Sequence, residues 1–456
     1  MDLPASLLQS LQGIPGYDAD AFQAVHSSGK QIVSIRINEQ KISKASFLKV
    51  WDAPCALDPV PWCSSGFYLS ERPSFTLDPF FHAGAYYVQE ASSMLLEQAM
   101  QQKADLSKPL VVIDLCAAPG GKSTLLQSLI HRDSLLISNE VIQSRVSVLR
   151  ENVIKWGGGN VLVTHNDPRD FKQLSGFADV LVVDAPCSGS GLFRRDPAAM
   201  EEWSLPNVEH CSQRQQRILA DAWDCLKTGG LLIYSTCSYS EAENEAIANW
   251  LTQEMHTVPQ RLTMDASWGI SETISSIGTY GYRCWPDKVQ GEGFFLAVFR
   301  KEDHQDTHSL RVKKKFSLPV QQKNIAAAWI KQSEEIDFVL QGTQMAAVPK
   351  MHVETIQLLM EHLRVRYAGV ELGTIAKDDL LPSHALALSD LVSDTVQSIT
   401  LNKEQALQYL RKQNFDLHIE QKGWIRVMYQ GLSLGWLKSL GNRFNNYYPK
   451  EYRILK

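Results

Sequence analysis

The 456-residue sequence lacks any run of about 20 consecutive apolar residues, the length that a helix needs to cross a bilayer. Its first six residues also lack the basic and then apolar pattern of a signal peptide. These two absences predict a cytoplasmic protein that makes no contact with a membrane.

Cysteine is scarce as well, with only eight residues in the chain. That number is too small for a disulfide scaffold at this length, and no two cysteines have the CxxC spacing of a metal site. We therefore expect reduced thiols and no bound metal, which leaves nucleophilic roles open to individual cysteines.

An excess of positive charge is also missing, since the formal net charge is −5 (45 − 50). The charge is unevenly distributed, however, because residues 401–456 contain ten Lys or Arg against four Asp or Glu, which gives +6 (10 − 4). The run at 311–315 is basic too, and it follows a polar stretch that is typical of a linker. A cationic C-terminal part suggests a polyanionic partner, although charges that only solvate a surface would give the same count.

The length predicts two or three domains, because a single hydrophobic core rarely extends beyond about 250–300 residues. The first part, residues 1–105, contains one strand-like run at 32–38 and a segment rich in proline and aromatic residues. A helical pattern at 89–96 ends this part, and we expect that helix to pack on the first strand of the sheet that follows.

From about 109 to 300, apolar runs alternate with helical patterns, as in a doubly wound parallel sheet with helices on both faces. The expected strands are 110–114, 135–140, 161–164, 180–184, 231–235 and a closing strand at 293–299. Ligands of such sheets bind beyond the carboxyl ends of the strands. Four acidic residues at or just beyond these ends should therefore converge there: Asp114, Glu140, Asp167 and Asp184.

A glycine-rich turn, DLCAAPGGKS at 114–123, follows the first of these strands. Its glycines let the backbone approach a ligand at a helix N-terminus, but the spacing is neither GxGxxG nor GxxxxGK[ST], which argues against simple dinucleotide or ATP binding. Glu140 suits hydrogen bonds from two ribose hydroxyls, and Asp167 suits an adenine amine. A lone acid at a strand end is more often a helix cap, so the ordered set carries more weight than any one member.

Two cysteines follow apolar strands of the same predicted sheet, Cys187 in DAPCSGSG and Cys237 in STCSYSEAENE. Two thiols beside a cofactor loop suggest covalent catalysis, and the sequence leaves open which of them attacks. Cys237 precedes an acidic helix start, and thiols near helix N-termini generally carry more thiolate. Burial as a small apolar side chain is the expectation for other cysteines, Cys116, Cys211, Cys225 and Cys284.

The motifs DLCAAPGGKS, DAPCSGSG and STCSYSEAENE, in this order and spacing, resemble the RNA cytosine-5 methyltransferases that use S-adenosylmethionine. That family includes bacterial ribosomal members and the eukaryotic nucleolar NOL1/NOP2/Sun proteins, and the resemblance covers about residues 80–300. The tail, at 423–436 and 445–450, resembles the PUA-like RNA-binding end of the bacterial branch that modifies 16S ribosomal RNA.

The resemblance implies an α/β fold, a Rossmann-like class I S-adenosylmethionine methyltransferase domain with a small N-terminal α+β region and a C-terminal PUA-like mixed barrel. An internal repeat, RVxYxGxxLG, occurs at 364–373 and 426–435, and each copy predicts strand, turn and strand. The implied boundaries are 1–105 for an N-terminal RNA-contacting region, 106–300 for the methyltransferase domain, 301–325 for a basic linker and 326–456 for the PUA-like RNA-binding domain.

The resemblance also implies roles for single residues. One loop would wrap the methionine part of the cofactor, namely Cys116, Ala117, Ala118, Pro119, Gly120, Gly121 and Lys122. Glu140 would hold its ribose and Asp167 its adenine, while Asp184 would lie between the cofactor and the base. Cys237 would be the nucleophile, and Cys187 would assist release of the product.

RNA contacts are expected at both ends of the chain. Cations and aromatic residues that could meet phosphates and bases are Lys438, Arg443 and Lys450, near Trp436 and Tyr447. Core aromatics with solubilising charges would explain the same pattern. Arg36 and Asn38 are candidates in the N-terminal region, where solvation of the surface is the other interpretation.

The expected function is S-adenosylmethionine-dependent methylation of C5 of cytosine in RNA, with 16S ribosomal RNA as the substrate, through a covalent adduct of Cys237 with C6. Three alternatives stay open: a methyltransferase-fold RNA-binding or ribosome-assembly factor, a transfer-RNA cytosine-5 methyltransferase, and a methyltransferase that acts on protein or a small molecule. The paired thiols disfavour a pure binding protein, which needs neither. The expected partners are RNA and the small ribosomal subunit, and the expected state is a monomer.

Overall fold

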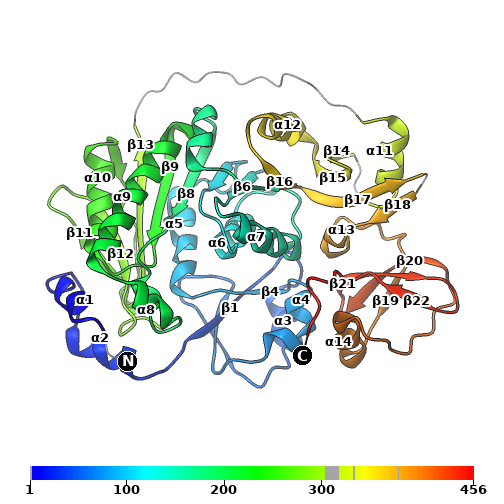
Figure 1. Ribbon diagram of the computed structural model, residues 1–456, viewed down its shortest axis with the longest axis horizontal. Coiled ribbons are helices and arrows are strands. Elements are labelled where there is room, and N and C mark those ends of the chain that lie inside the picture. Colours follow the sequence, from blue (N-terminus) through cyan, green and yellow to red (C-terminus); the bar gives the residue numbers. More distant parts are fainter. Residues whose placement is uncertain (1–2, 303–317, 332–333, 378, 456) are drawn as a thin grey trace.

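The computed structural model describes residues 3–302, 318–331, 334–377 and 379–455; the basic run at 311–315, expected in a linker, lies outside them. In Figure 1 the large sheet and its helices occupy the left and centre, and two smaller C-terminal sheets lie to their right. No helix in these ranges is both long and apolar enough to span a membrane.

Ten strands form the largest sheet: β5 (Val111–Asp114), β6 (Leu135–Asn139), β7 (Val161–Thr164), β8 (Ala178–Asp184), β9 (Leu226–Thr236), β10 (Thr257–Pro259), β11 (Ser271–Ile274), β12 (Tyr280–Cys284), β13 (Phe294–Lys301) and β16 (Val365–Ala368). Their order is β11-β12-β13-β9-β8-β5-β6-β7-β16, with β10 paired to β13. The five strands from β9 to β7 are parallel, and β13 is antiparallel to β9. The predicted α/β class is confirmed, and β9 begins earlier than expected, at Leu226.

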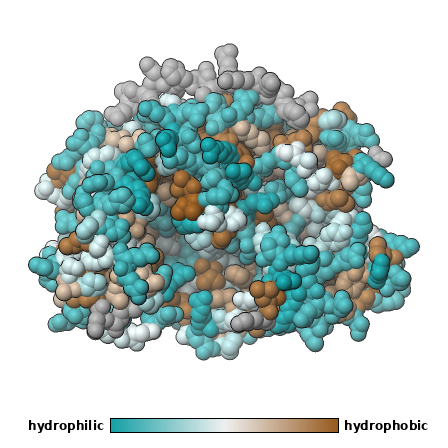
Figure 2. Space-filling view, in the orientation of Figure 1, coloured by the Kyte–Doolittle hydropathy of each residue, from teal (hydrophilic) through white to brown (hydrophobic). Residues whose placement is uncertain are grey.

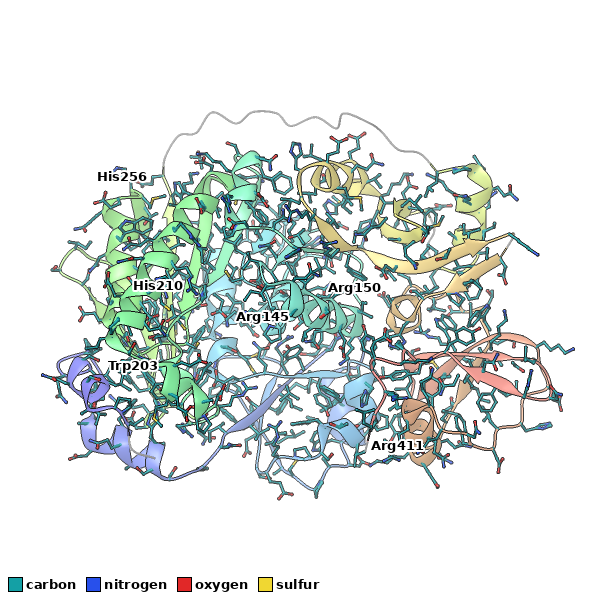
Figure 3. All side chains as sticks on the ribbon, viewed as in Figure 1. Arg145, Arg150, Trp203, His210, His256 and Arg411 are labelled. Carbon is teal, nitrogen blue, oxygen red and sulfur yellow. The ribbon has the colours of Figure 1, made fainter. Side chains whose placement is uncertain are left out.

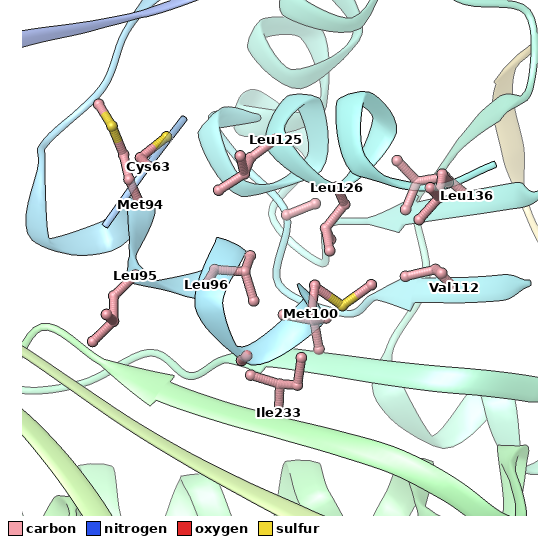
Figure 4. Packing of buried hydrophobic residues seen from close by; sticks show 14 of the residues in the cluster. Cys63, Met94, Leu95, Leu96, Met100, Val112, Leu125, Leu126, Leu136 and Ile233 are labelled. Atoms are coloured by element: carbon pink, nitrogen blue, oxygen red, sulfur yellow. The ribbon is translucent and has the colours of Figure 1, made fainter. Parts of the chain in front are cut away.

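Helices cover both faces of this sheet, which is why the middle of each parallel strand is apolar on both sides. One face carries α5 (Leu96–Lys103), α6 (Gly121–Leu129) and α7 (Gln143–Trp156), and the other carries α9 (Leu205–Ala222), α10 (Glu245–Gln253) and α12 (Val353–His362). The short helix α8 (Ala198–Glu202) precedes α9. Figure 4 shows Met100 of α5 beside Val112 of β5 and Ile233 of β9, so α5 packs on the first parallel strand as expected.

The helix expected at 89–96 begins later than the pattern predicts. The Glu90 carboxylate accepts hydrogen bonds from the backbone N–H groups of Ser92 and Ser93, both at 2.9 Å, and a 3₁₀ turn (Ser92–Leu95) starts there. The α-helix proper, α5, follows this turn.

The N-terminal region has its own sheet, of order β2-β3-β1-β4. Its elements are α1 (Ala5–Ser10), α2 (Ala19–Ser27), β1 (Val33–Ile37), α3 (Lys44–Val50), β2 (Leu57–Pro59), β3 (Gly66–Leu69), α4 (Pro79–His82) and β4 (Tyr86–Val88). The expected strand at 32–38 is therefore the central strand β1.

Arg36 and Asn38, the residues expected to touch RNA in this region, are both fully buried. The Arg36 guanidinium donates to the Thr124 hydroxyl at 2.6 Å and lies 4.5 Å from the centre of the Trp156 ring. Asn38 donates to the backbone oxygen of Trp156 at 3.0 Å. The expectation of RNA contact is wrong for both, because they join the N-terminal sheet to α6 and α7.

The C-terminal region contains two further four-stranded sheets, β14-β15-β17-β18 and β19-β20-β21-β22. Its elements are α11 (Val320–Ala327), β14 (Ile336–Gln341), β15 (Gln344–Pro349), β17 (Val370–Ala376), β18 (Asp379–Pro382), α13 (His384–Leu388), β19 (Ser398–Thr400), α14 (Lys403–Arg411), β20 (Gly423–Tyr429), β21 (Leu432–Ser439) and β22 (Phe444–Asn446). The apolar side of the last sheet shares a core with the N-terminal sheet, in which Val427 and Leu434 pack with Phe80.

The internal repeat does form strand, turn and strand twice, but its two copies belong to different sheets. The second copy, β20 and β21, is an antiparallel hairpin. In the first copy β16 pairs with β7 of the central sheet, whereas β17 pairs with β15 and β18. The segment 326–456 therefore does not fold as one barrel, since β16 extends the methyltransferase sheet itself.

A substitution in β16 tests this extension. Tyr367 is 1 % exposed and packs in the same core as Leu136 and Val163. We expect Tyr367→Ala to lower the free energy of unfolding by about 3–5 kcal/mol, because the ring leaves a cavity in the main core. Urea unfolding followed by circular dichroism measures this, and Tyr367→Phe is the matched control that keeps the ring. A loss below about 1 kcal/mol for the alanine variant would show that β16 is not part of the cooperative sheet.

Candidate functional site

The site lies between β5 and β8, where the strand order of the sheet changes direction. From β5 the chain continues to β6 and β7 on one side and then returns to β8 and β9 on the other. Ligands of open α/β sheets bind at the carboxyl edge of this point. The structure brings Asp114 and Asp184 to that edge, at the ends of the neighbouring strands β5 and β8.

The glycine-rich turn connects β5 to α6, and hydrogen bonds from α7 hold it in place. Arg145 donates to the backbone oxygen of Ala118 at 2.5 Å, and Asn152 donates to that of Pro119 at 2.8 Å. Gly120 precedes α6 with φ of +116°, a conformation that favours glycine. A Cβ there would lie 3.3 Å from side-chain atoms of Leu149 and Asn152, so the turn packs closely on α7.

Asp114 is fully buried at the start of this turn. The Ser123 hydroxyl donates to its Oδ2 at 2.6 Å, while Oδ1 has no hydrogen-bond partner in the described part of the chain. Burial and, to a smaller extent, the nearby carboxylate of Asp184 raise the pKa of Asp114 to about 7, against the opposing hydrogen bond from Ser123. This turn thus contains a carboxyl group that takes up a proton close to neutral pH.

Asp184 faces the same turn and is held by two groups. Lys122 Nζ lies 2.8 Å from Asp184 Oδ2, and the Ser235 hydroxyl donates to Oδ1 at 2.8 Å. Burial by itself would lower the pKa of Lys122, but the attraction to Asp184 outweighs it, and the pKa of Lys122 lies above its ordinary value. The ammonium group therefore stays charged beside the carboxylate.

Glu140 and Asp167 follow β6 and β7, as the sequence predicts. Glu140 is buried, accepts the backbone N–H of Ile142 at 2.8 Å and lies 3.5 Å from Arg145, which Figure 3 labels on α7. Asp167 caps the 3₁₀ turn Pro168–Gln173 through the N–H of Arg169 at 3.1 Å. Asp167 therefore serves as a helix cap, the alternative considered from sequence, and its contact with a ligand stays a prediction.

The two cysteines of the sequence motifs come together at the same edge. Cys187 Sγ lies 3.0 Å from Cys237 Sγ, and both are free thiols that are partly exposed. Hydrogen bonding to Cys237 and burial raise the pKa of Cys187 well above its ordinary value. The Cys187 thiol therefore stays protonated near neutral pH.

Glu243 holds the two cysteine loops together, and sequence reasoning did not identify it. Its side chain accepts the backbone N–H and the hydroxyl of Ser188, at 2.7 and 2.6 Å, and the hydroxyl of Ser238 at 2.5 Å. Gln215 of α9 also donates to it at 3.3 Å. Each serine directly follows one of the cysteines. The only signal in the sequence was its place in the acidic run after Cys237, which is indistinguishable from a helix start.

The remaining cysteines are buried or partly buried. Cys211, Cys225 and Cys284 are buried, as the sequence predicts. Cys116 is intermediate in exposure, and burial, followed by the nearby carboxylates, raises its pKa. No cluster of His, Cys, Asp or Glu suited to a metal ion occurs in the ranges that the structure describes.

The C-terminal candidates for RNA contact are divided by the structure. Arg443 and Lys450 are exposed, and Tyr447 is 47 % exposed with its ring 4.5 Å from that of Trp424. Trp436 is 1 % exposed, so it belongs to the core and cannot stack on a base. Lys438 is half-buried, with its ammonium 4.9 Å from the centre of the Trp424 ring.

Solved structures share the fold over part of this chain. A methyltransferase homologue from Pyrococcus horikoshii is 29% identical and has a TM-score of 0.53; the match covers 66% of this chain and all of that one. NSun6 from the same organism, crystallised with SFG, has a TM-score of 0.57 at 19% identity, over 66% of this chain and 99% of its own. The strand order and the turn after β5 define the class, a methyltransferase that uses S-adenosylmethionine.

Sequence comparison identifies the family within this class. Residues 102–300 match the profile of 16S rRNA methyltransferase RsmB/F, residues 3–91 that of the N-terminal domain of RsmF, and residues 396–454 that of the RsmF PUA domain. The chain is 33% identical to ribosomal RNA small subunit methyltransferase F of Shewanella woodyi, over 92% of this chain and 90% of the relative. Its counterpart in Shewanella frigidimarina is 31% identical over 92% and 91%. The chain therefore belongs to the RsmF branch of the 16S rRNA methyltransferase family.

The buried carboxyl of Asp114 predicts a pH dependence of stability. Its pKa is raised in the folded state, so its contribution to stability is fully present below about pH 4 and is lost as the pH rises through about 7. We expect Asp114→Asn to remove that loss, on the order of a few kcal/mol between pH 5 and pH 8. Chemical unfolding at both pH values measures it, with the exposed Asp58→Asn as control. The same pH dependence in Asp114→Asn and in the parent protein would contradict the assignment.

Proposed function

We propose that this protein methylates C5 of a cytosine in 16S ribosomal RNA through a covalent bond between Cys237 and C6 of the base. The observation that supports this most strongly is the pair of sulfur atoms 3.0 Å apart at the carboxyl edge of the sheet. Methyl transfer to an oxygen or nitrogen nucleophile requires no thiol, whereas C5 of cytosine is too poor a nucleophile without one. The substrate RNA is inferred from the names of the matching relatives.

The residues around the glycine-rich turn fit S-adenosylmethionine. The loop from Cys116 to Lys122 would hold its methionine part, and the unpartnered Oδ1 of Asp114 is a polar atom that the turn itself does not satisfy. Glu140 would accept the ribose hydroxyls, and Asp167 the adenine amine. When bound, the cofactor supplies the methyl group that C5 of the cytosine takes up.

Cys237 is assigned as the nucleophile. Hydrogen bonding to Cys237 and burial hold the pKa of Cys187 well above its ordinary value, which disfavours Cys187 as the attacking thiolate. Lys122, whose ammonium lies 2.8 Å from Asp184, brings positive charge to the same edge of the sheet. The thiolate adds to C6 of the base. The π electron pair of the C5–C6 double bond moves to C5, which becomes nucleophilic.

Completion of the reaction requires a proton to leave C5 and the C6–S bond to break. The proton goes to a base in the site while the electrons of the C5–H bond restore the C5–C6 double bond and expel Cys237 as thiolate. Cys187 lies beside the departing sulfur and assists this elimination. Asp184, held by Lys122 and Ser235, would orient the ring through N3 or the exocyclic amine.

The RNA-binding surface is proposed to include the C-terminal sheet. Residues 396–454 match the PUA profile, and Arg443 and Lys450 are exposed cations near the half-exposed Tyr447. Cations of this kind meet phosphates, and an exposed aromatic ring can stack on a base. Lys438 is the weakest of the three proposed contacts because its ammonium lies over Trp424.

Two cysteine variants separate the proposed roles. Cys237→Ala should abolish methyl transfer, because no adduct can form, and Cys187→Ala should accumulate a denaturant-resistant complex between protein and RNA, because release is slowed. Both are measured with small-subunit ribosomal RNA and labelled S-adenosylmethionine, by 5-methylcytidine analysis and denaturing gels. The buried Cys211→Ala is the control and should retain activity. Equal residual turnover in the two variants would overturn the assignment.

Glu243 is expected to act as a positioning residue for both thiols. Glu243→Gln should lower kcat by as much as about 100-fold, because small displacements of reacting groups are costly, and should leave cofactor affinity unchanged. The negative charge of Glu243 also raises the pKa of Cys187, so its removal should move the alkaline side of the pH–rate profile to lower pH. A lower kcat with an unmoved pH profile would reduce Glu243 to a purely structural role.

A further inference from the structure

A cavity of about 320 Å³ lies between the N-terminal sheet and α7 and is not used by the site described above. Its walls come from β4, α4 and α7, which meet below the centre of Figure 1. The lining residues include Arg72, Phe75, Phe81, Tyr87, Lys155 and Arg195. Figure 2 shows this face of the molecule to be largely hydrophilic and hollowed near its centre.

The charged groups that line the cavity are all positive. Arg72 and Arg195 are exposed, and neither side chain has a hydrogen bond or ion pair with any residue that the structure describes. Arg72 and Arg195 also line a smaller hollow next to the cavity. The two arginines therefore lie on the rim between the cavity and this hollow. Lys155 is paired with Glu151 at 2.7 Å. Two arginines free to bind an anion thus stand at the entrance.

Two acidic residues lie close to this rim. Glu90 and Glu292 line the smaller hollow. Glu90 accepts backbone N–H groups of Ser92, Ser93 and Glu292, each at 2.9 Å. Glu292 is 4 % exposed and lies 3.8 Å from Arg194. Neither carboxylate forms an ion pair with Arg72 or Arg195 in the described part of the chain, although Glu292 is close enough to Arg195 to interact with it electrostatically.

The cavity walls are aromatic. Phe81 and Tyr87 are partly exposed, and Phe75 lies with its ring centre 5.4 Å from the Arg72 guanidinium. Aromatic rings beside cations are the combination that binds unpaired nucleotides, with stacking for the base and charge for the phosphate. A volume of about 320 Å³ is at the lower end of the range for small-molecule sites, which leaves room for one nucleotide.

The cavity adjoins both halves of the candidate site. The Asn152 side chain lies 3.4 Å from the Tyr87 hydroxyl and also donates to the backbone oxygen of Pro119 in the glycine-rich turn. On the other side, Arg195 follows the loop in which the N–H of Gly191 donates to the backbone oxygen of Cys237 at 2.8 Å. A strand of RNA that places one base at the thiols would therefore continue over this rim.

We propose that the cavity binds a single-stranded nucleotide next to the target cytosine, with its phosphate on Arg72 and Arg195 and its base against Phe81 and Tyr87. This inference rests on the proposed function, since it supplies the path of the RNA that carries the cytosine. It makes the N-terminal sheet part of substrate recognition through residues other than the buried Arg36 and Asn38.

The test measures RNA affinity as a function of salt for Arg72→Ala, Arg195→Ala and the double variant, with an unmodified 16S ribosomal RNA transcript. A plot of the logarithm of the RNA association constant against the logarithm of the salt concentration has a negative slope. Each single variant should reduce the magnitude of that slope by about 0.7, the value for one phosphate contact on a single strand, and the double variant by about twice that. Arg217→Ala is the matched control, because Arg217 is an exposed arginine on α9 at the opposite face of the sheet. S-adenosylmethionine affinity and melting temperature should not change in any variant.

A photocrosslinking amino acid at the exposed Thr76 provides a second measurement. It should crosslink to a nucleotide adjacent to the cytosine that becomes methylated. Unchanged salt slopes in the double variant, or crosslinks confined to distant RNA, would overturn the cavity assignment. If the parent protein forms no 5-methylcytidine while the slopes still fall, the proposed chemistry fails and the RNA site stands.

Discussion

The geometry of the site depends on one buried carboxylate. Glu243 accepts hydrogen bonds from the residues that follow both thiols, Ser188 after β8 and Ser238 after β9. Burial raises its pKa, and these hydrogen bonds oppose that effect. Hydrogen bonds to an ionised acceptor are about twice as strong as neutral ones, and an unsatisfied buried carboxylate would be costly. The two loops are thus fixed relative to each other, which is the condition for two sulfur atoms to stand 3.0 Å apart.

The sheet around this carboxylate depends on both ends of the chain. Arg36 ties the N-terminal sheet to α6, and β16 from the C-terminal part continues the central sheet beyond β7. The last sheet in turn packs against the N-terminal sheet. Removal of 326–456 would therefore uncover the main core rather than detach an independent module. The RNA-binding surfaces proposed at the two ends would be held in fixed positions around the thiols by the same contacts that stabilise the fold.

The parallel strands, the cofactor turn and the paired thiols could be predicted from sequence, because each depends on local apolar runs or on residues that directly follow a strand. The partners of Arg36 could not be predicted, since Gln89 and Thr124 lie far along the chain and an arginine in a strand is usually exposed. The same holds for β16, whose pattern predicts a strand but not that it pairs with β7. Glu243 was visible as one acid in an acidic helix start, and only the fold shows that it faces inward.

The most direct test of the central claim is to identify the sulfur that bonds to the base. A 16S ribosomal RNA transcript containing 5-fluorocytidine has no proton to lose from C5, so elimination is blocked and any adduct persists. The protein would be incubated with this RNA and S-adenosylmethionine, digested, and the crosslinked peptide sequenced by mass spectrometry. The account predicts a methylated fluorocytosine attached to Cys237. Attachment to Cys187, or no covalent complex, would contradict it.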